Sequence, residues 1–213
     1  MKKTIARSFI ATALLLTVTS CGADGKQTNP ATDGCAELLG KSGMEWAQKE
    51  AGGEELERSG VSLHSAREEY YRQMDPWDPE ASRWESELCT MSAGTPGDRK
   101  FLKLEFGPSS LPFDFDDKKK PDGVVTITNE DVKLHVTKDF KGVTHFGIYV
   151  KCKIPGTSPR QGNITPLAGV LTDTLTEGAS QTTHLTHLLH STRVMVDSLG
   201  CENNPSIPSH PPA

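Results

Sequence analysis

The chain has 213 residues, of which 35% are hydrophobic, 6% aromatic and 24% charged, and its formal net charge at pH 7 is −5. This length and composition favour one folded domain over a disordered chain or several domains. The acidic balance disfavours nucleic-acid binding, because carboxylates and phosphate groups repel each other.

The N-terminal 21 residues have the pattern of a cleaved targeting segment. Lys2, Lys3 and Arg7 supply positive charge, an apolar run follows at 8–18, and small or β-branched residues lead into Cys21. The run is about half of the ~20 residues that span a bilayer, so it favours a secretory signal over a permanent transmembrane helix. Its end resembles a lipobox, in which the cysteine receives the two acyl chains of a diacylglycerol and becomes the first mature residue. The alternative is an ordinary secreted protein with a coincidental cysteine.

Lipidation of Cys21 predicts an exported protein that is anchored to the outer face of the cell membrane. Leaving out residues 1–21 removes three positive charges and no negative ones, so the formal net charge falls from −5 to −8. We therefore expect membrane contact through the acyl chains rather than through a basic patch.

Two polar segments predict the limits of the folded domain. Residues 22–34 are rich in Gly, Thr, Asn, Asp and Pro and have no apolar periodicity, which predicts a flexible tether. Residues 202–213 contain four prolines and predict a tail that is ordered only near Cys201. The folded domain is then expected at residues 35–201.

The first part of this domain predicts two helices. Residues 35–51 are expected to form a helix that is broken around the glycines at 40–43. Residues 62–74 have apolar side chains at offsets of three and four, and Ser62 can cap the helix that they form.

The middle of the chain predicts an antiparallel sheet of about five strands, at residues 84–93, 101–106, 124–128, 132–137 and 143–154. The last of these alternates most clearly, with Phe146, Ile148 and Val150 on one face and Tyr149 and Lys151 on the other. Such alternation is typical of a sheet with one face in the core and one face in solvent.

The end of the domain predicts a long connection and a helix. Residues 155–172 contain Gly and Pro, and their length makes them a candidate functional loop or a crossover to the last helix. Residues 182–199 carry a leucine-rich stripe at helical spacing, and Gly200 can end the helix. The predicted fold class is therefore α+β, with the sheet packed by N-terminal helices and a C-terminal helix.

Four cysteines remain once Cys21 is assigned to lipid, and an even number outside the cytoplasm predicts two disulfides. Sequence alone allows three connectivities. We expect Cys35–Cys201 and Cys89–Cys152, because the first pair flanks the domain and the second pair lies in strand-like segments.

Three histidines, His184, His187 and His190, recur along the last helix. On a helical projection they lie at about 260°, 200° and 140°, against an apolar stripe near 340°. We therefore expect a solvated histidine face. A weak metal site or a pH-sensitive partner surface is the alternative.

The acidic segment FDFDDKKKPDG contains Asp114, Asp116, Asp117 and Asp122. Calcium prefers several carboxylates on one loop, but this spacing is not that of an EF-hand and the lysines compete for the same groups. A charged surface loop is the preferred interpretation. The sequence contains no nucleophile elbow, nucleotide-binding glycine loop or other cofactor motif, so we expect no cofactor.

Several short motifs carry a family resemblance: the lipobox at Cys21, Cys35-Ala-Glu-Leu-Leu, a strand with Cys89, Tyr149-Val-Lys-Cys152-Lys-Ile-Pro-Gly, and Leu199-Gly200-Cys201-Glu-Asn. With them the chain resembles lipoproteins of actinomycetes that have no assigned activity. The resemblance implies an envelope protein whose cysteines are structural, and it implies no catalytic residues. Some such lipoproteins have a Mog1/PsbP-like fold with helices on an antiparallel sheet, which fits the predicted order of elements.

The expected function is that of a non-enzymatic envelope lipoprotein that binds a ligand or an envelope protein. The exposed sheet face around Tyr149 or the connection at 155–172 would supply the binding surface. One alternative is a metal-dependent or hydrolytic enzyme that uses the face with His184, His187 and His190. The other is a structural component of an envelope assembly.

Overall fold

The structure is a computed structural model and describes residues 33–75, 78, 80–115 and 123–212. The predicted signal with Cys21 and most of the tether lie outside the described residues, as do Asp116, Asp117 and Asp122. Within the described ranges, no helix is long and apolar enough to cross a membrane.

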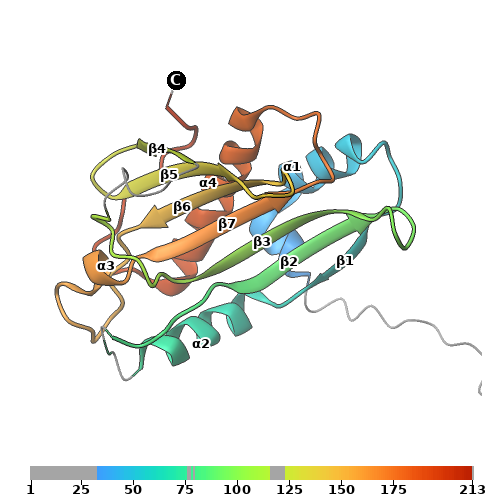
Figure 1. The fold of residues 1–213 in the computed structure, drawn as a ribbon. Helices are drawn as coiled ribbons and strands as arrows, with labels where there is room; N and C mark the ends of the chain where they lie inside the picture. The colour runs from blue at the N-terminus through green and yellow to red at the C-terminus, as the bar shows by residue number, and fades with distance from the viewer. Residues whose placement is uncertain (1–32, 76–77, 79, 116–122, 213) are drawn as a thin grey trace, which may run out of the picture.

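The described strands form one antiparallel sheet of seven strands in the order β1-β2-β3-β7-β6-β5-β4 (Figure 1). Their bounds are β1 Glu57–Gly60, β2 Ser86–Ala93, β3 Lys100–Pro108, β4 Gly123–Ile127, β5 Val132–Lys138, β6 Thr144–Val150 and β7 Leu167–Asp173. The predicted α+β class and antiparallel sheet are confirmed. The five expected strands are present, and the short edge strand β1 and the central strand β7 join them.

Strand β7 corrects the prediction that residues 155–172 form a connection. Residues 167–172 belong to the middle strand of the sheet, where β7 pairs with β3 on one side and β6 on the other. The segment LAGVLTD is buried on both sides along most of its length, so it lacks the alternation that identified the other strands. The true connection runs from residue 151 to residue 166 and contains the one-turn helix α3, Gln161–Ile164.

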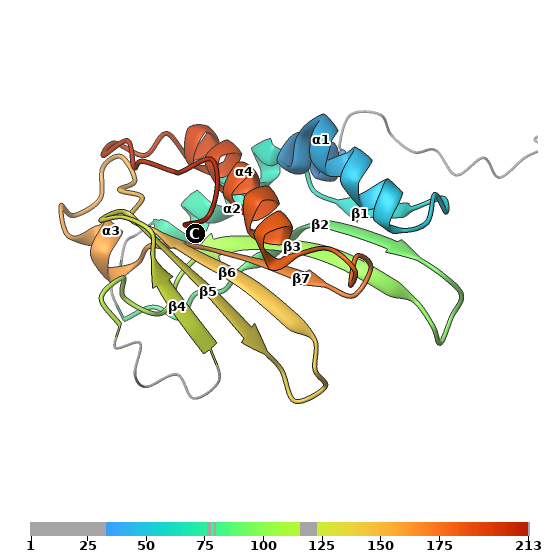
Figure 2. The same ribbon diagram turned by 90° about the horizontal axis from the view of Figure 1, so that it is seen from above.

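The three long helices α1 (Gly34–Glu50), α2 (Leu63–Met74) and α4 (Gln181–Leu199) cover one face of the sheet (Figure 2). We call this the helical face and the opposite side the open face. The expected break in α1 is present at Gly40, whose backbone angles of φ 62° and ψ −178° are not helical. Ser62 caps α2 by accepting the N–H of Ser65, and Gly200 ends α4 in a left-handed conformation.

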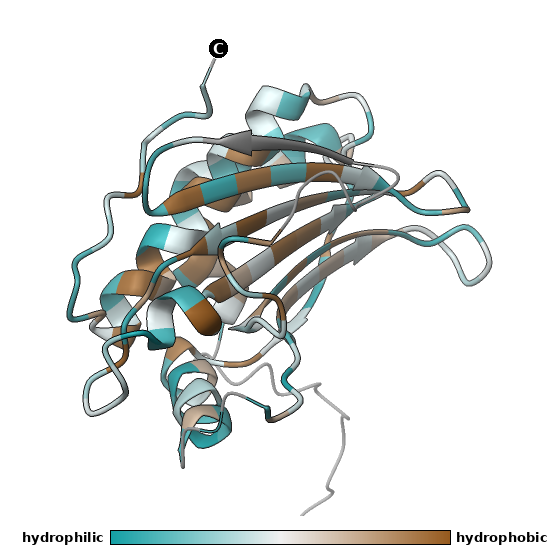
Figure 3. Cartoon of the chain, turned by 60° about the vertical axis from the view of Figure 1, so that its left-hand side comes forward, coloured by the Kyte–Doolittle hydropathy of each residue, from teal (hydrophilic) through white to brown (hydrophobic). Residues whose placement is uncertain are grey.

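The main core lies between the sheet and these helices. Leu102, Leu104, Ile148 and Leu171 point from the strands toward the helices, and Leu188 of α4 packs against them. Figure 3 shows the matching alternation of hydrophobic and hydrophilic residues along the strands. The predicted inward face of β6, with Phe146, Ile148 and Val150, is buried as expected.

The four described cysteines form the disulfides Cys35–Cys89 and Cys152–Cys201, with Cα–Cα distances of 4.8 and 5.1 Å. The predicted pairs Cys35–Cys201 and Cys89–Cys152 are therefore wrong. Strand β2, which holds Cys89, lies three strand spacings from β6, which precedes Cys152. Three spacings are about 14 Å, too far for a disulfide to bridge.

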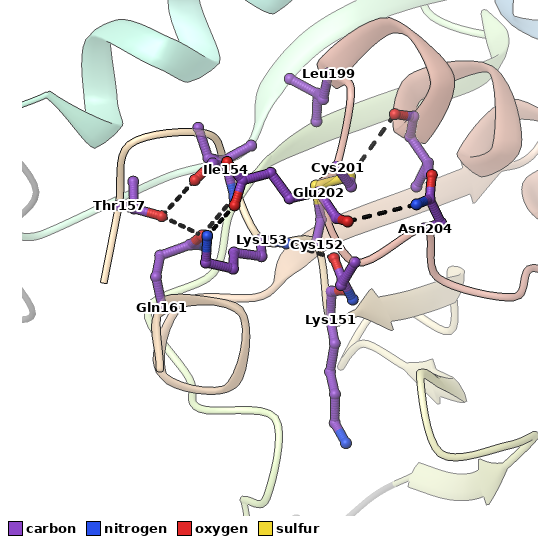
Figure 4. The surroundings of a disulfide bond; sticks show 12 residues. Lys151, Cys152, Lys153, Ile154, Thr157, Gln161, Leu199, Cys201, Glu202 and Asn204 are labelled. Atoms are coloured by element: carbon purple, nitrogen blue, oxygen red, sulfur yellow. Dashed lines mark hydrogen bonds and ion pairs between the residues drawn. A yellow bond between two sulfur atoms is a disulfide. The ribbon is translucent and has the colours of Figure 1, made fainter. Parts of the chain in front are cut away.

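Each disulfide instead joins a helix end to the strand region beneath it. Cys35 lies in the first turn of α1, directly over β2, and Cys201 follows the end of α4 beside the connection after β6 (Figure 4). Both bonds are buried and fit an oxidising environment outside the cytoplasm.

Candidate functional site

The histidines of α4 lie against the helix α1 rather than in solvent. His184 is only 4% exposed, which contradicts the expected solvated face. Its ring stacks on Phe146 of β6 at a centroid distance of 4.4 Å. His187 stacks on Trp46 of α1 at 4.2 Å, and His190 lies beside Gly40 of the same helix. Helix α4 packs against both the sheet and α1. The helical projection considered one buried side only, the one that carries the apolar stripe.

His184 belongs to a sealed polar cluster at the junction of β7 and α4. Its Nε2 lies 2.6 Å from Oδ2 of Asp173, and its Nδ1 lies 2.8 Å from the carbonyl oxygen of Ser180. A carboxylate and a carbonyl both accept hydrogen bonds, so both ring nitrogens of His184 lie within hydrogen-bond distance of an acceptor. The hydroxyl of Thr176 also donates to the Asp173 carboxylate.

The surroundings of Asp173 favour the ionised form of its carboxyl group. Burial raises the pKa of Asp173, but the hydrogen bonds from His184 and Thr176 outweigh it and hold that pKa below its ordinary value. Burial and the neighbouring histidines lower the pKa of His187 to about 4, so His187 is neutral at pH 7.

The cluster combines an acid, a base and a hydroxyl, as many hydrolytic sites do, but a substrate cannot reach it. The side chains of His184 and Asp173 are 5% and 1% exposed. In the part of the chain that the structure describes, no three His, Cys, Asp or Glu side chains come together as a metal site. The arrangement of His184, His187 and His190 therefore lends no support to the metal alternative.

A second candidate site lies on the open face, at the end of β6. Tyr149, on the sheet face that was expected to be exposed, is only 7% exposed because Phe113 and Phe115 from the connection after β3 cover it. The rings of Phe115 and Tyr149 meet edge to face at 5.0 Å, and burial raises the pKa of Tyr149 to about 12. The exposed face predicted around Tyr149 is therefore closed at this end of the sheet.

Beside this aromatic cluster is a cavity of about 550 Å³, which we call the α3 cavity. Its lining comes from the β3–β4 connection, the residue after β6, and α3: Pro112, Phe113, Asp114, Lys151, Arg160, Asn163 and Ile164. The ammonium group of Lys151 lies 4.7 Å from the centre of the Phe113 ring. Among the described residues, no carboxylate lies within 4.0 Å of the cationic group of Lys151 or Arg160. The cavity therefore presents two cations beside an aromatic surface.

Both walls of the α3 cavity are held by hydrogen bonds. The N–H of Phe113 donates to the carbonyl oxygen of Asn163 at 2.7 Å, which ties the β3–β4 connection to α3. The buried side chain of Gln161 accepts the N–H of Ile154 at 2.8 Å (Figure 4). It also donates to the carbonyl oxygen of Thr165 at 2.8 Å. These buried hydrogen bonds fix the backbone of the connection that carries Arg160.

The Cys152–Cys201 disulfide fixes the strand end next to Lys151. The amide of Asn203 donates to the carbonyl oxygen of Lys151 at 2.6 Å, so the segment after α4 braces the same position. Figure 4 shows the Lys151 side chain pointing away from the disulfide. Lys151 thus extends from a backbone that is fixed on both sides.

The sequence located part of this cavity. Arg160, Asn163 and Ile164 lie in the predicted 155–172 connection, and Lys151 lies on the predicted outward side of β6. Phe113 was not identified from the sequence, because the carboxylates of the FDFDD segment were considered and not its aromatic rings. The aromatic residues at every second position were the available signal.

Comparisons of the chain with models of protein families, with curated proteins and with solved structures find no match. The resemblance to actinomycete lipoproteins and to the Mog1/PsbP-like fold therefore stays a prediction, and function has to be argued from geometry.

Proposed function

We propose that the protein is an exported lipoprotein, anchored through Cys21, that binds a small organic anion in the α3 cavity. The signal pattern ending at Cys21 supports the anchor, and the two disulfides support export. The observation that carries the binding proposal is the pair of cations, Lys151 and Arg160, at a cavity with an aromatic wall.

The chemistry of the lining selects the ligand class. A guanidinium group binds carboxylate, sulfonate or phosphate oxygens in a forked geometry, and an ammonium group adds a second positive charge. The ring of Phe113 offers apolar contact to the rest of the ligand. Asp114 at the same rim repels a second negative group, which favours a ligand with one anionic end and an apolar body.

The proposal can be tested with anilinonaphthalene sulfonate, an aromatic sulfonate whose fluorescence rises on apolar contact. We expect saturable binding at one site of the folded, oxidised protein. The double variant Lys151→Gln/Arg160→Gln should weaken binding about tenfold or more, because loss of a charge-assisted hydrogen bond costs about 1.5–3 kcal/mol.

The matched control is Lys41→Gln, which removes one exposed positive charge from α1, away from the cavity. It should leave the affinity unchanged, and thermal melting should show that all variants are folded. Binding that is absent, or that is equal in the double variant and the wild type, would contradict the proposal.

The anchor is tested separately by mass spectrometry of the N-terminal peptide from membrane-extracted protein. We expect Cys21 to be the first residue and to carry acyl chains. The variant Cys21→Ser should lose the acyl groups and leave the membrane fraction.

A further inference from the structure

The connection between β5 and β6 holds an aromatic ring almost fully in solvent. Phe140 is 95% exposed, whereas the other exposed large hydrophobic side chains of the described residues, Val61, Trp84 and Leu111, lie between 39% and 52%. The hairpin extends past the body of the sheet (Figure 3). The whole ring of Phe140 therefore lies in water, and its burial in a partner would gain hydrophobic free energy.

The turn around Phe140 is rigidly built. The Asp139 carboxylate accepts the N–H groups of Lys141 and Val143 at 2.8 and 3.0 Å. The backbone of Asp139 also exchanges hydrogen bonds with Val143 and Gly142, and Gly142 takes the positive φ of 84° that this turn requires. Phe140 therefore projects from a fixed apex rather than from a loose loop.

Two exposed lysines flank the ring. Lys138 ends β5 and Lys141 follows Phe140, with the Lys141 ammonium group 5.6 Å from the ring centre. Desolvation raises the pKa of Asp139, but hydrogen bonds from Val143, Lys141 and His145 outweigh it and hold that pKa below its ordinary value. The Asp139 carboxylate is thus bonded within the turn, and residues 138–142, the β5–β6 tip, carry two lysine charges and one carboxylate, a net charge of +1, beside an aromatic ring.

We infer that the β5–β6 tip contacts the surface of an anionic phospholipid bilayer, with the ring of Phe140 in the interface and the two lysines at the headgroups. Aromatic rings favour the membrane interface, and lysine side chains keep their charge at headgroup level while their stems lie on apolar surface. Each lysine near an anionic surface contributes about 1 kcal/mol. Acidic groups on the rest of the domain oppose this contact little, because charges more than about 8 Å away are screened at physiological salt.

This inference rests on the anchoring part of the proposed function. It adds a small lysine-flanked contact to the acyl chains, whereas the net charge alone predicted contact through the acyl chains only. Twelve residues separate Cys21 from Gly34, and a fully extended segment of that length spans about 40 Å at most. That span is comparable with the diameter of a domain of this size. The anchor would raise the local concentration of bilayer around the tip, so a weak contact is sufficient.

The test places a tryptophan at the tip of the acylated full chain. The variant Phe140→Trp is reconstituted in vesicles that contain phosphatidylglycerol and phosphatidylcholine with brominated acyl chains, which quench nearby tryptophan. The matched control is Glu130→Trp, in the exposed turn at the other end of the same strand β5. We expect the added fluorescence of the first variant to fall at least twofold and that of the control to stay unchanged.

The dependence of quenching on lysine and lipid charge distinguishes the inferred contact from nonspecific adsorption of the domain to the membrane. Adding Lys138→Gln and Lys141→Gln to Phe140→Trp, or using phosphatidylcholine alone, should restore most of the fluorescence. No quenching at position 140, or equal quenching at positions 130 and 140, overturns the inference while the acyl groups on Cys21 still support the anchor. A chain whose N-terminal peptide carries no acyl group overturns both.

Discussion

Two adjacent residues of the central strand β7 each contact a histidine, one on either face of the sheet, and the two histidines differ in their exposure to solvent. On the helical face, Asp173 pairs with His184, whose side chain is 5% exposed. On the open face, the adjacent Thr172 has its hydroxyl 3.0 Å from Nδ1 of His145, whose side chain is 31% exposed and whose Nε2 lies 3.6 Å from Asp139. The Asp173–His184 contact on the helical face is therefore sealed at the join between strand and helix, whereas His145 on the open face keeps part of its ring in solvent.

The difference follows from what covers each face. Helices α1 and α4 close over the Asp173 side of the strand, so any charge there has to be paired within the protein. A single connection with Phe113 and Phe115 covers part of the other side. The cover on the open face is therefore partial, while that over Asp173 and His184 is nearly complete.

The largest expected effect is on the helical face. The variant Asp173→Ala leaves the buried side chain of His184 without its carboxylate partner, and we expect a loss of about 3–5 kcal/mol in the free energy of unfolding. Urea denaturation followed by circular dichroism measures it. A loss below about 1 kcal/mol would show that the Asp173–His184 contact does not stabilise the junction of β7 and α4.

A smaller effect should appear as a pH dependence from His187. Its pKa is about 4 in the folded protein, below the ordinary value of 6.5, so the unfolded chain binds more protons between these values. Stability should therefore fall as the pH drops from about 6.5 to about 4, by about 1–2 kcal/mol once the shift is discounted for the partial exposure of His187. The lowered pKa of Asp173 adds a further loss only below about pH 4, where its carboxylate becomes protonated.

The control for this dependence is His187→Gln, which keeps a planar polar side chain that cannot titrate. Urea midpoints measured at pH 7 and at pH 4.5 should differ less in this variant than in the wild type. Equal differences in both proteins would contradict the assignment to His187.

The smallest effect is expected on the open face. The variant His145→Ala removes a partly exposed contact with Asp139 and Thr172, so the melting temperature should change by no more than about 3 °C. Thermal melting by circular dichroism beside Asp173→Ala makes the comparison direct. A change as large as that of Asp173→Ala would mean that the two faces do not differ as described.

Local sequence signals predicted the local parts of the fold. The alternation in β6, the cap at Ser62 and the end of α4 at Gly200 depend on side chains close in sequence, and the structure shows all three. The break of α1 near Gly40 was predicted for the same reason.

The incorrect predictions concern contacts between distant segments. The disulfide partners depend on strand order, which places Cys89 and Cys152 three strands apart. The burial of His184 depends on α1 crossing α4, and the covering of Tyr149 depends on Phe113, 36 positions earlier. None of these long-range contacts leaves a periodic pattern in the sequence of the segment that it buries or joins.

The central claim is that the open face binds an organic anion at the α3 cavity. The most direct measurement is a titration of isotope-labelled protein with anilinonaphthalene sulfonate, followed by two-dimensional NMR. The account predicts saturable shifts that centre on Phe113, Lys151 and Asn163 and spare the Asp173–His184 cluster. Shifts that centre on the helical face, or that scatter over the whole surface without saturating, would contradict it.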